Sequence, residues 1–234
     1  SGIEEITIPK TINYIDKYAF SECSYLKEII IPSSVKSIGE HAFDGCTSLN
    51  KISIPSSISS FGFQIFEGVV SLEILGDITS IPNILFLKNS TIEKLIFSSS
   101  ITLIEKGSFS GCISLKEIFI PLIKSINEYT FCNCESLTDI KIPSSVISIK
   151  ANAFENCSSL EEIEIPSSVE SIDNYAFKNC SSLTKISIPS SVTSFGEQVF
   201  DGIESFEISG DISIIPNKLF EKCSSLVQIE IPSS

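Results

Sequence analysis

The side chains with the most evident chemical potential are eight cysteines, seven of which recur at one spacing. Each of the seven lies three residues after a recurring phenylalanine: Cys23, Cys46, Cys112, Cys134, Cys157, Cys180 and Cys223. A thiol that returns at one phase of a repeat should occupy one place in every copy, so we expect a row of thiols in the core. Buried free cysteine behaves as a small apolar residue. We predict reduced structural thiols; disulfides between neighbouring repeats are the alternative, because adjacent strands lie about 4.8 Å apart.

Cys132 is out of phase with the other cysteines and forms the pair Cys132-Asn133-Cys134. A zinc site needs a second pair of cysteine or histidine ligands at a set spacing. The single histidine, His41, belongs to a different repeat. We therefore predict no metal site, and we interpret Cys132 as a surface thiol that can oxidise or cross-link two chains.

Catalytic groups of other kinds do not converge in the sequence. Nucleophilic catalysis needs a base beside the nucleophile, and His41 stands at a variable position where other repeats carry Tyr18 and Tyr175. We expect His41 in a turn, facing solvent or stacked on a neighbour. Repeated carboxylate pairs such as Glu161-Glu162 are typical of a solvated face rather than of a glycosidase site. The sequence also lacks a glycine-rich phosphate loop, so we predict no catalytic residues, no cofactor and no enzymatic activity.

A repeat of 20–23 residues positions all of these side chains. Its phenylalanines are Phe20, Phe43, Phe66, Phe86, Phe109, Phe131, Phe154, Phe177, Phe200 and Phe220. A well-preserved unit, Leu160 to Ser182, reads LEEIEIPSSVESIDNYAFKNCSS. Repetition on this scale indicates stacked units rather than an ordinary globule.

Within that unit, apolar residues alternate near the end of Leu160–Ile165, which predicts a strand with one buried face. Pro166 ends the strand because it cannot donate a hydrogen bond, and Asn174–Phe177 is compatible with one helical or 3₁₀ turn. One such unit cannot bury its apolar side, whereas stacked copies can. The sequence predicts one leucine-rich-repeat solenoid over 1–234, with about ten repeats. We expect a parallel β-sheet of short strands on the concave face and turns, including 3₁₀ or helical turns, on the convex side.

Two of the repeats are short, and they correspond to each other. Phe61–Asp77 reads FGFQIFEGVVSLEILGD, and FGEQVFDGIESFEISGD follows 134 residues later, which is six repeats. We predict a second-order duplication of six units. We also expect the short coils to bend the stack or to interrupt its strand surface at Gly76 and Gly210.

Composition restricts the classes of partner. The net charge is -13, and all 16 basic residues are lysines. Such a chain repels nucleic acid backbones and anionic lipid surfaces. It has no apolar run near the ~20 residues that cross a bilayer, so we expect no membrane insertion by this segment. The opening at Ser1 without a methionine predicts a fragment of a longer protein.

Outward positions of the predicted strands are mostly polar, with two exceptions on adjacent repeats. Ile96 and Phe119 are large and apolar, whereas their neighbours carry lysine and glutamate. An apolar pair rimmed by charge is typical of a protein interface. The candidate protein-binding residues are Ile96, Phe119, Lys94, Glu117, Lys141, Glu162 and Glu164.

The pattern LxxIxIPSSVxSIxxxAFxxCSSL resembles the BspA-type leucine-rich repeat of surface proteins in anaerobic bacteria and parasitic protists. The resemblance implies a cell-surface or secreted location and adhesion to host cells, matrix proteins or other cells. Asn89 would then be a candidate glycosylation acceptor. Our hypothesis is a non-catalytic protein-binding scaffold that acts through the concave strand face. The alternative is a structural protein that self-associates, as a homodimer or a higher assembly, through repeat surfaces or end coils.

Overall fold

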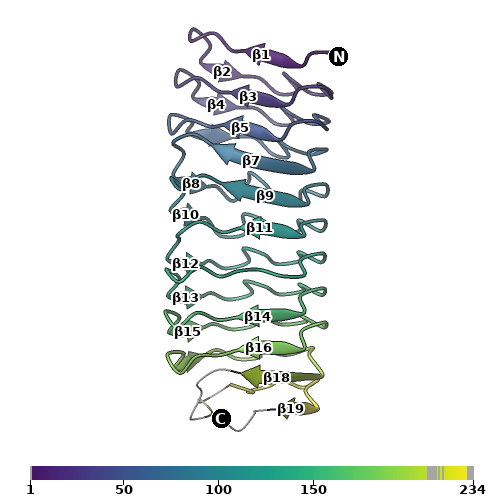
Figure 1. Ribbon diagram of the computed structural model, residues 1–234, viewed down its shortest axis with the longest axis vertical. Helices are drawn as coiled ribbons and strands as arrows, with labels where there is room; N and C mark the ends of the chain where they lie inside the picture. Colours follow the sequence, from purple (N-terminus) through teal and green to yellow (C-terminus); the bar gives the residue numbers. More distant parts are fainter. Residues whose placement is uncertain (1, 210–214, 216, 218, 231–234) are drawn as a thin grey trace.

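The chain winds into a column of stacked coils, as the repeat predicts (Figure 1). The computed structural model describes residues 2–209, 215, 217 and 219–230. Every strand pairing is parallel and joins one coil to the next. In Figure 1 the column is nearly straight, so we call the outer surface of its main sheet the strand face.

Every coil except the one that contains residues 139–142 contributes a described strand to a main ladder. Its members are β1 (Glu5–Thr7), β3 (Glu28–Ile30), β5 (Lys51–Ser53), β7 (Ser71–Leu75), β9 (Lys94–Phe97), β11 (Glu117–Phe119), β14 (Glu162–Glu164), β16 (Lys185–Ser187), β18 (Ser205–Ser209) and β19 (Gln228–Glu230). Of these strands, the six from β1 to β11 form one sheet, and the four from β14 to β19 form another. Alternation of side chains along the strands follows from the two-residue period of a strand: in β14, Ile163 is buried between exposed Glu162 and Glu164.

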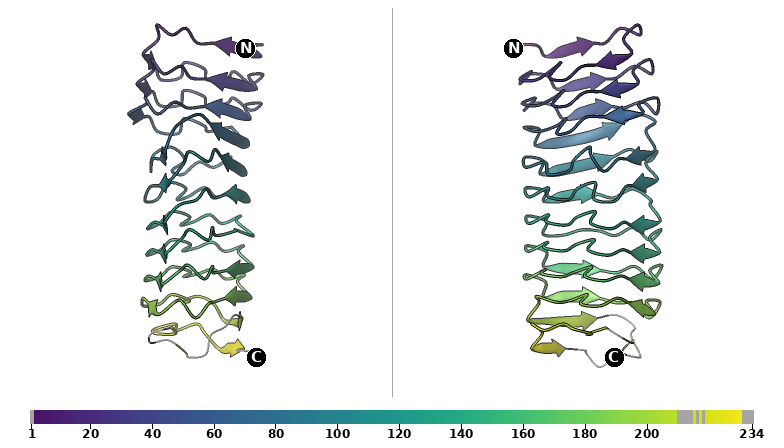
Figure 2. Two further views of the ribbon diagram at one scale, coloured as in Figure 1. Left: turned by 60° about the vertical axis from the view of Figure 1, so that its left-hand side comes forward. Right: turned by 180° about the vertical axis from the view of Figure 1, so that it is seen from behind.

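A second, narrower ladder follows the turn after the main-ladder position of each coil and runs along one side of the column (Figure 2). It comprises β2 (Tyr14–Ile15), β4 (Ser37–Ile38), β6 (Ser60–Phe61), β8 (Ser80–Ile81), β10 (Leu103–Ile104), β12 (Ser125–Ile126), β13 (Ser148–Ile149), β15 (Ser171–Ile172) and β17 (Ser194–Phe195). These strands divide into three sheets. The divisions fall between β6 and β8 and between β10 and β12, where the repeat shortens.

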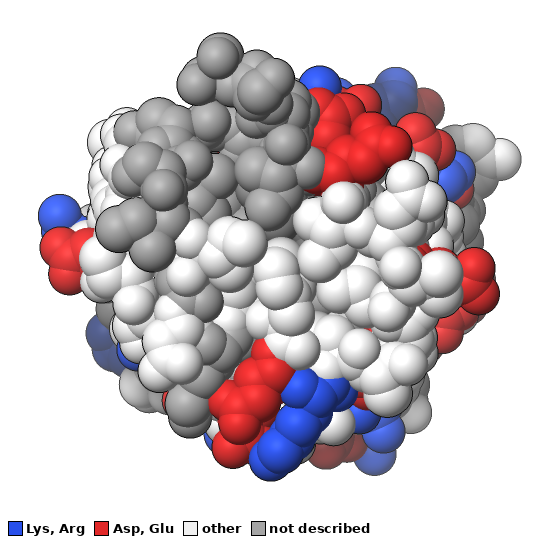
Figure 3. Space-filling view, turned by 90° about the horizontal axis from the view of Figure 1, so that it is seen from below, with Lys and Arg blue, Asp and Glu red and all other residues white. Residues whose placement is uncertain are grey.

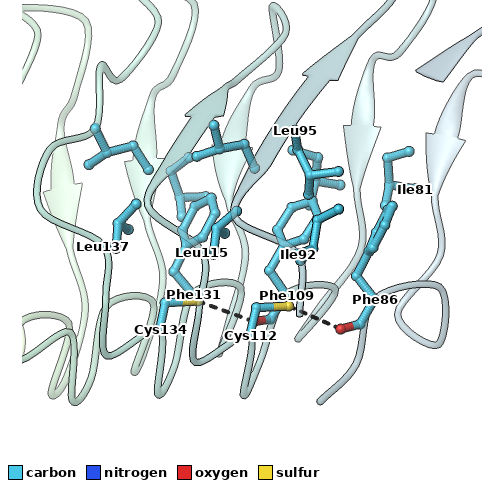
Figure 4. Close-up of a cluster of buried hydrophobic side chains, with 14 of the residues drawn as sticks. Ile81, Phe86, Ile92, Leu95, Phe109, Cys112, Leu115, Phe131, Cys134 and Leu137 are labelled. Carbon is cyan, nitrogen blue, oxygen red and sulfur yellow. Dashed lines mark hydrogen bonds between the residues drawn. The ribbon is translucent and has the colours of Figure 1, made fainter. Parts of the chain in front are cut away.

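The repeat phenylalanines form a continuous stack through the core. Ring centroids of successive residues from Phe20 to Phe200 lie 5.2 to 6.0 Å apart. Figure 4 shows three of these rings with buried isoleucine and leucine side chains packed above them. Phe43 to Phe200 are at most 1% exposed, so the predicted alignment of the repeats is confirmed.

The cysteines form a second row beside the phenylalanines, and all eight are free. The Cys112 thiol donates to the carbonyl oxygen of Phe86 at 3.0 Å, and the Cys134 thiol donates to that of Phe109 at 3.2 Å (Figure 4). Cys46, Cys157 and Cys180 make the same bond to the preceding coil. The predicted row of thiols in the core is confirmed, and their reduced state stays a prediction. The hydrogen bond gives a reason for cysteine at this position, because it satisfies a buried carbonyl.

Serines of the proline turns make a similar bond. Ser145, Ser168 and Ser191 each donate a hydroxyl hydrogen to a carbonyl oxygen in the preceding coil, at 2.7, 2.6 and 2.8 Å. In both rows the side-chain donor therefore belongs to the later coil and the acceptor to the earlier one.

Cys132 does not lie at the surface, so its interpretation as a surface thiol is wrong. Its side chain is 5% exposed and lies against Asn133, whose amide donates to its sulfur at 3.4 Å, and Glu155 of the next coil. Burial, reinforced by the nearby Glu155 carboxylate, raises the pKa of the Cys132 thiol to about 11. This thiol is therefore protonated and shielded in the folded chain.

The convex side consists of turns, and the described residues contain no helix. The expected 3₁₀ or helical turn is not confirmed, because residues with left-handed backbone geometry stand on both sides of most of the repeat phenylalanines. Tyr175 and Asn179 flank Phe177 with φ of 61° and 58°, which a right-handed helix cannot accommodate. Glycine or asparagine often fills the second site, as at Gly111 and Asn156, because these residues tolerate the left-handed region best.

The first short coil does not interrupt the main sheet at Gly76, contrary to expectation. Instead β7 is longer and shifts the ladder: Glu73 faces Lys51 on β5 and Ile96 on β9, while Ser71 faces Lys94. A shift of two residues keeps every side chain on its own face. The narrow ladder is the one that divides here.

The second short coil repeats this geometry as far as the structure describes it. Lys185 faces Glu207 on β18, whereas Ser205 faces Gln228 on β19, which is the same two-residue shift. Gly210 lies outside the described residues, and the six-repeat duplication stays a prediction.

Gly76→Ala is expected to lower the free energy of unfolding by about 2 kcal/mol or more. Gly76 has a φ of 95°, and a Cβ there would lie 2.3 Å from the carbonyl oxygen of Ile54. Urea denaturation followed by circular dichroism measures the change. Gly2→Ala is the matched control, because a Cβ at Gly2 meets nothing within 4 Å. Equal stability of both variants would contradict the close packing of β7 on β5.

Candidate protein-binding face

Four of the residues that the sequence singles out meet on β9 and β11. Phe119 lies directly opposite Ile96, and Glu117 lies opposite Lys94. The Lys94 ammonium is 2.9 Å from the Glu117 carboxylate and 5.5 Å from the centre of the Phe119 ring. Phe119 is 54% exposed, whereas Ile96 is half-buried. We call Ile96, Phe119, Lys94 and Glu117 the β9–β11 cluster.

The register shift in β7 changes what surrounds this cluster. By repeat phase alone Ile96 belongs in a row with Ser53, but the observed pairing places it in a row with Lys51, Glu73 and Phe119. Lys51 and Glu73 form an ion pair at 3.6 Å. The apolar pair therefore continues a row of mutually neutralised charges, which favours an apolar rather than an ionic contact at Phe119.

Leu122 is an exposed apolar residue that the sequence analysis did not select. It is 74% exposed and follows Phe119 by three positions. The signal was present: this coil carries Pro121-Leu122-Ile123 where others carry proline, two serines and an aliphatic residue. The missing residue accounts for the 22-residue spacing between Phe109 and Phe131.

The other three candidate residues lie in a separate place. Lys141, Glu162 and Glu164 line a shallow groove of about 730 Å³. Its lining comprises Asp139 to Ser144, Glu162 to Glu164, Pro166, Lys185 and Ser187; we call it the groove. The seven candidates thus form two adjoining regions of the strand face rather than one.

The groove coincides with the interruption of the main ladder between β11 and β14. Residues 139–142 take the place of a strand but are not assigned one. Ile140 and Ile142 are nevertheless buried, and Asp139 and Lys141 are exposed. The coil keeps the in-and-out pattern of a strand without its main-chain pairing.

The remaining groups with chemical potential are used structurally. His41 stacks on Tyr18 with ring centroids 5.0 Å apart, as expected of a stacked turn residue, and its Nδ1 is 3.5 Å from the Asp44 carboxylate. Within the described residues no group of three His, Cys, Asp or Glu side chains could hold a metal ion. That part of the chain also contains no helix with the length and apolarity to cross a membrane.

Asn89 is not available for a glycan in the folded chain. It is 1% exposed and occupies the position of the repeat cysteine, where its amide donates to the carbonyl oxygen of Phe66 at 2.9 Å. Its own side-chain oxygen accepts from the main-chain N–H of Ile92 at 2.8 Å. Asn89 is therefore a polar substitute for the thiol in the core row.

Comparison with known families agrees with this architecture. The family model described as "BspA type Leucine rich repeat region (6 copies)" matches residues 1–116, 79–203 and 124–234, which together span the chain. The chain belongs to the BspA-type leucine-rich repeat family. Proteins with leucine-rich repeats are generally non-catalytic scaffolds for binding other proteins. Among curated proteins, none matches the chain.

Solved structures of bacterial leucine-rich repeat proteins share the fold. One from Bacteroides ovatus is 27% identical with a TM-score of 0.53, over 96% of this BspA-type chain and 60% of its own length. The Treponema protein TpLRR, from T. pallidum, is 25% identical with a TM-score of 0.52, over 81% and 80% of the two chains. The BspA-type chain thus spans less than two thirds of the Bacteroides protein.

Proposed function

We propose that this chain is a non-catalytic scaffold that holds another protein on its strand face, with Phe119 at the centre of the contact. The observation that carries the proposal is the β9–β11 cluster. A half-exposed aromatic ring opposite Ile96 is flanked by a lysine that already pairs with Glu117. Burying this ring removes apolar surface from water and requires no charge to be desolvated alone.

The family resemblance supports a more specific role. Cell-surface or secreted location, and adhesion to host cells, matrix proteins or other cells, are what BspA-type repeats imply. The net charge of -13 favours a basic or neutral protein partner over nucleic acid.

Phe119→Glu is the direct test. We expect it to weaken partner binding at least about tenfold. The substitution removes the apolar ring from the contact and places a second carboxylate beside Glu117. Immobilised host-cell and extracellular-matrix proteins, screened by surface plasmon resonance, supply the partner. Ile30→Glu is the matched control: Ile30 is 63% exposed on the same sheet, in β3. Equal binding by wild type and Phe119→Glu would remove the cluster from the interface.

Self-association is a second candidate, favoured by the ends of the column. Phe20, Ile6 and Ile8 of the first described coil are only partly buried. Viewed from below, the uncoloured, uncharged residues of the opposite end occupy the middle and the charged residues gather at the rim (Figure 3). Contact between two first coils would bury the exposed parts of Phe20, Ile6 and Ile8. Light scattering across concentrations tests this candidate, and a monomer at every concentration would reject it.

A further inference from the structure

Between described strands of the face, the groove is the place where main-chain pairing from one coil to the next is lost. In the described chain, residues 139–142 make no main-chain hydrogen bond to β11 or β14. A link just before them runs from the Glu161 N–H to the Thr138 carbonyl at 3.3 Å. Unpaired N–H and C=O groups require water or a ligand. An extended peptide offers both donors and acceptors at the spacing of a strand.

The charges of the groove are unpaired as well. In the middle of the face, lysines and glutamates of adjacent strands neutralise each other in two places, Lys51–Glu73 and Lys94–Glu117. The groove holds three carboxylates and two ammonium groups: Asp139, Glu162, Glu164, Lys141 and Lys185. None of these five forms an ion pair with a described residue. Exposed charges without internal partners are free to pair across an interface.

We propose that the groove binds an extended segment of a partner protein that carries cationic side chains at every second position. The main chain of the segment supplies hydrogen-bonding groups to residues 139–142, and its cations pair with Glu162 and Glu164. These two glutamates lie two residues apart on one face of β14, which matches the two-residue period of an extended chain. The inference rests on the proposed function and specifies the partner's chemistry at a place separate from Phe119.

The choice of a basic segment follows from the balance of charge. The groove carries one more carboxylate than ammonium group, and the whole chain carries a net charge of -13. The long-range field therefore attracts a cation and repels an acidic peptide. The groove's two lysines limit the number of cations that it accepts. Binding therefore depends on the spacing of the cationic side chains along the segment as well as on its total charge.

The test uses the whole chain and a fluorescein-labelled octapeptide of alternating lysine and threonine, with fluorescence anisotropy at 150 mM salt. We expect saturable binding by the wild type and at least tenfold weaker binding by Glu162→Gln/Glu164→Gln. The matched control is Glu5→Gln/Glu28→Gln, which removes two exposed carboxylates from the same face at β1 and β3. We expect this control to bind within twofold of the wild type. Circular dichroism verifies that each variant is folded.

A second peptide separates docking from simple attraction of charge. The same octapeptide with alternate main-chain nitrogens methylated keeps its charges but loses those donors, and we expect at least tenfold weaker binding. Equal binding of both peptides, equal loss in the two double variants, or no binding by the wild type would overturn the proposal. If the peptide tests fail while partner binding is still weakened by Phe119→Glu, the groove is rejected as a peptide-binding site and the proposed function stands.

Discussion

Phe154→Ala should lower the free energy of unfolding by about 3–5 kcal/mol. The Phe154 ring is fully buried, and the Phe131 and Phe177 rings each lie 5.3 Å from it, nearly parallel. The neighbouring coils cannot move in to fill the cavity, because the Phe154 N–H is held to the Ala176 carbonyl at 2.8 Å. In a solenoid, stability is a sum over neighbouring repeats, so a weakened contact in mid-column should also separate the unfolding of the two halves.

Thermal and urea denaturation, followed by far-ultraviolet circular dichroism, measure both effects. Phe119→Ala removes the same side chain from the exposed position on β11 and should cost less than about 1 kcal/mol. A loss below 1 kcal/mol in Phe154→Ala would mean that the phenylalanine stack is not the main apolar support of the column.

The second large effect concerns alkaline pH. Burial raises the pKa of the Cys46 thiol to about 12, and burial also raises the pKa values of the Cys112, Cys134, Cys157 and Cys180 thiols well above the usual range. In the unfolded chain a thiol has a pKa of about 8.5. Below that pH the thiols are protonated in both the folded and the unfolded chain, so their full contribution to the free energy of unfolding is present. Above it the unfolded state binds fewer protons, so the free energy of unfolding falls by about 1.4 kcal/mol per pH unit for each buried thiol.

Urea midpoints at pH 8.0, 9.0 and 9.8 test this slope before most lysines and tyrosines titrate. Cys157→Val removes one thiol and should make the slope shallower by one such increment. Valine fits this position, because Val69 already occupies it in another coil and is fully buried. A stability that stays constant to pH 9.8 would contradict the thiol row, and an identical slope in Cys157→Val would assign the alkaline loss to other groups.

The sequence was sufficient where a residue type recurs at one phase. The spacing of phenylalanine and cysteine predicted both core rows, because side chains at equal phases must superpose when the coils stack. The same reasoning applied to Cys132 gave the wrong environment. Its phase is unique, so no neighbouring repeat could indicate that Asn133 and Glu155 lie against it.

Backbone detail was less predictable. Asn174–Phe177 is locally compatible with a helical turn, yet stacking imposes left-handed residues on either side of Phe177. The shortening of the repeat between the strand and Ile78 was visible in the sequence, but its outcome, a two-residue shift in the ladder at β7, depends on pairing between coils.

The groove had no signal in its own sequence. Residues 137–142 follow the repeat pattern completely, so a strand was expected there. The nearest irregularity lies one coil earlier, at Pro121-Leu122. Lys141, Glu162 and Glu164 were selected for their outward positions, whereas the unpaired main chain that makes them a separate site is a tertiary property.

The backward direction of the side-chain donors has a consequence for biosynthesis. Thiols such as Cys157 and hydroxyls such as Ser168 complete the hydrogen bonding of the coil made just before them. As a ribosome releases the chain from its N-terminus, each new turn finds the carbonyl acceptors of these side-chain donors already made. The coils can thus add one by one from the N-terminus to the C-terminus, in the order in which they are synthesised.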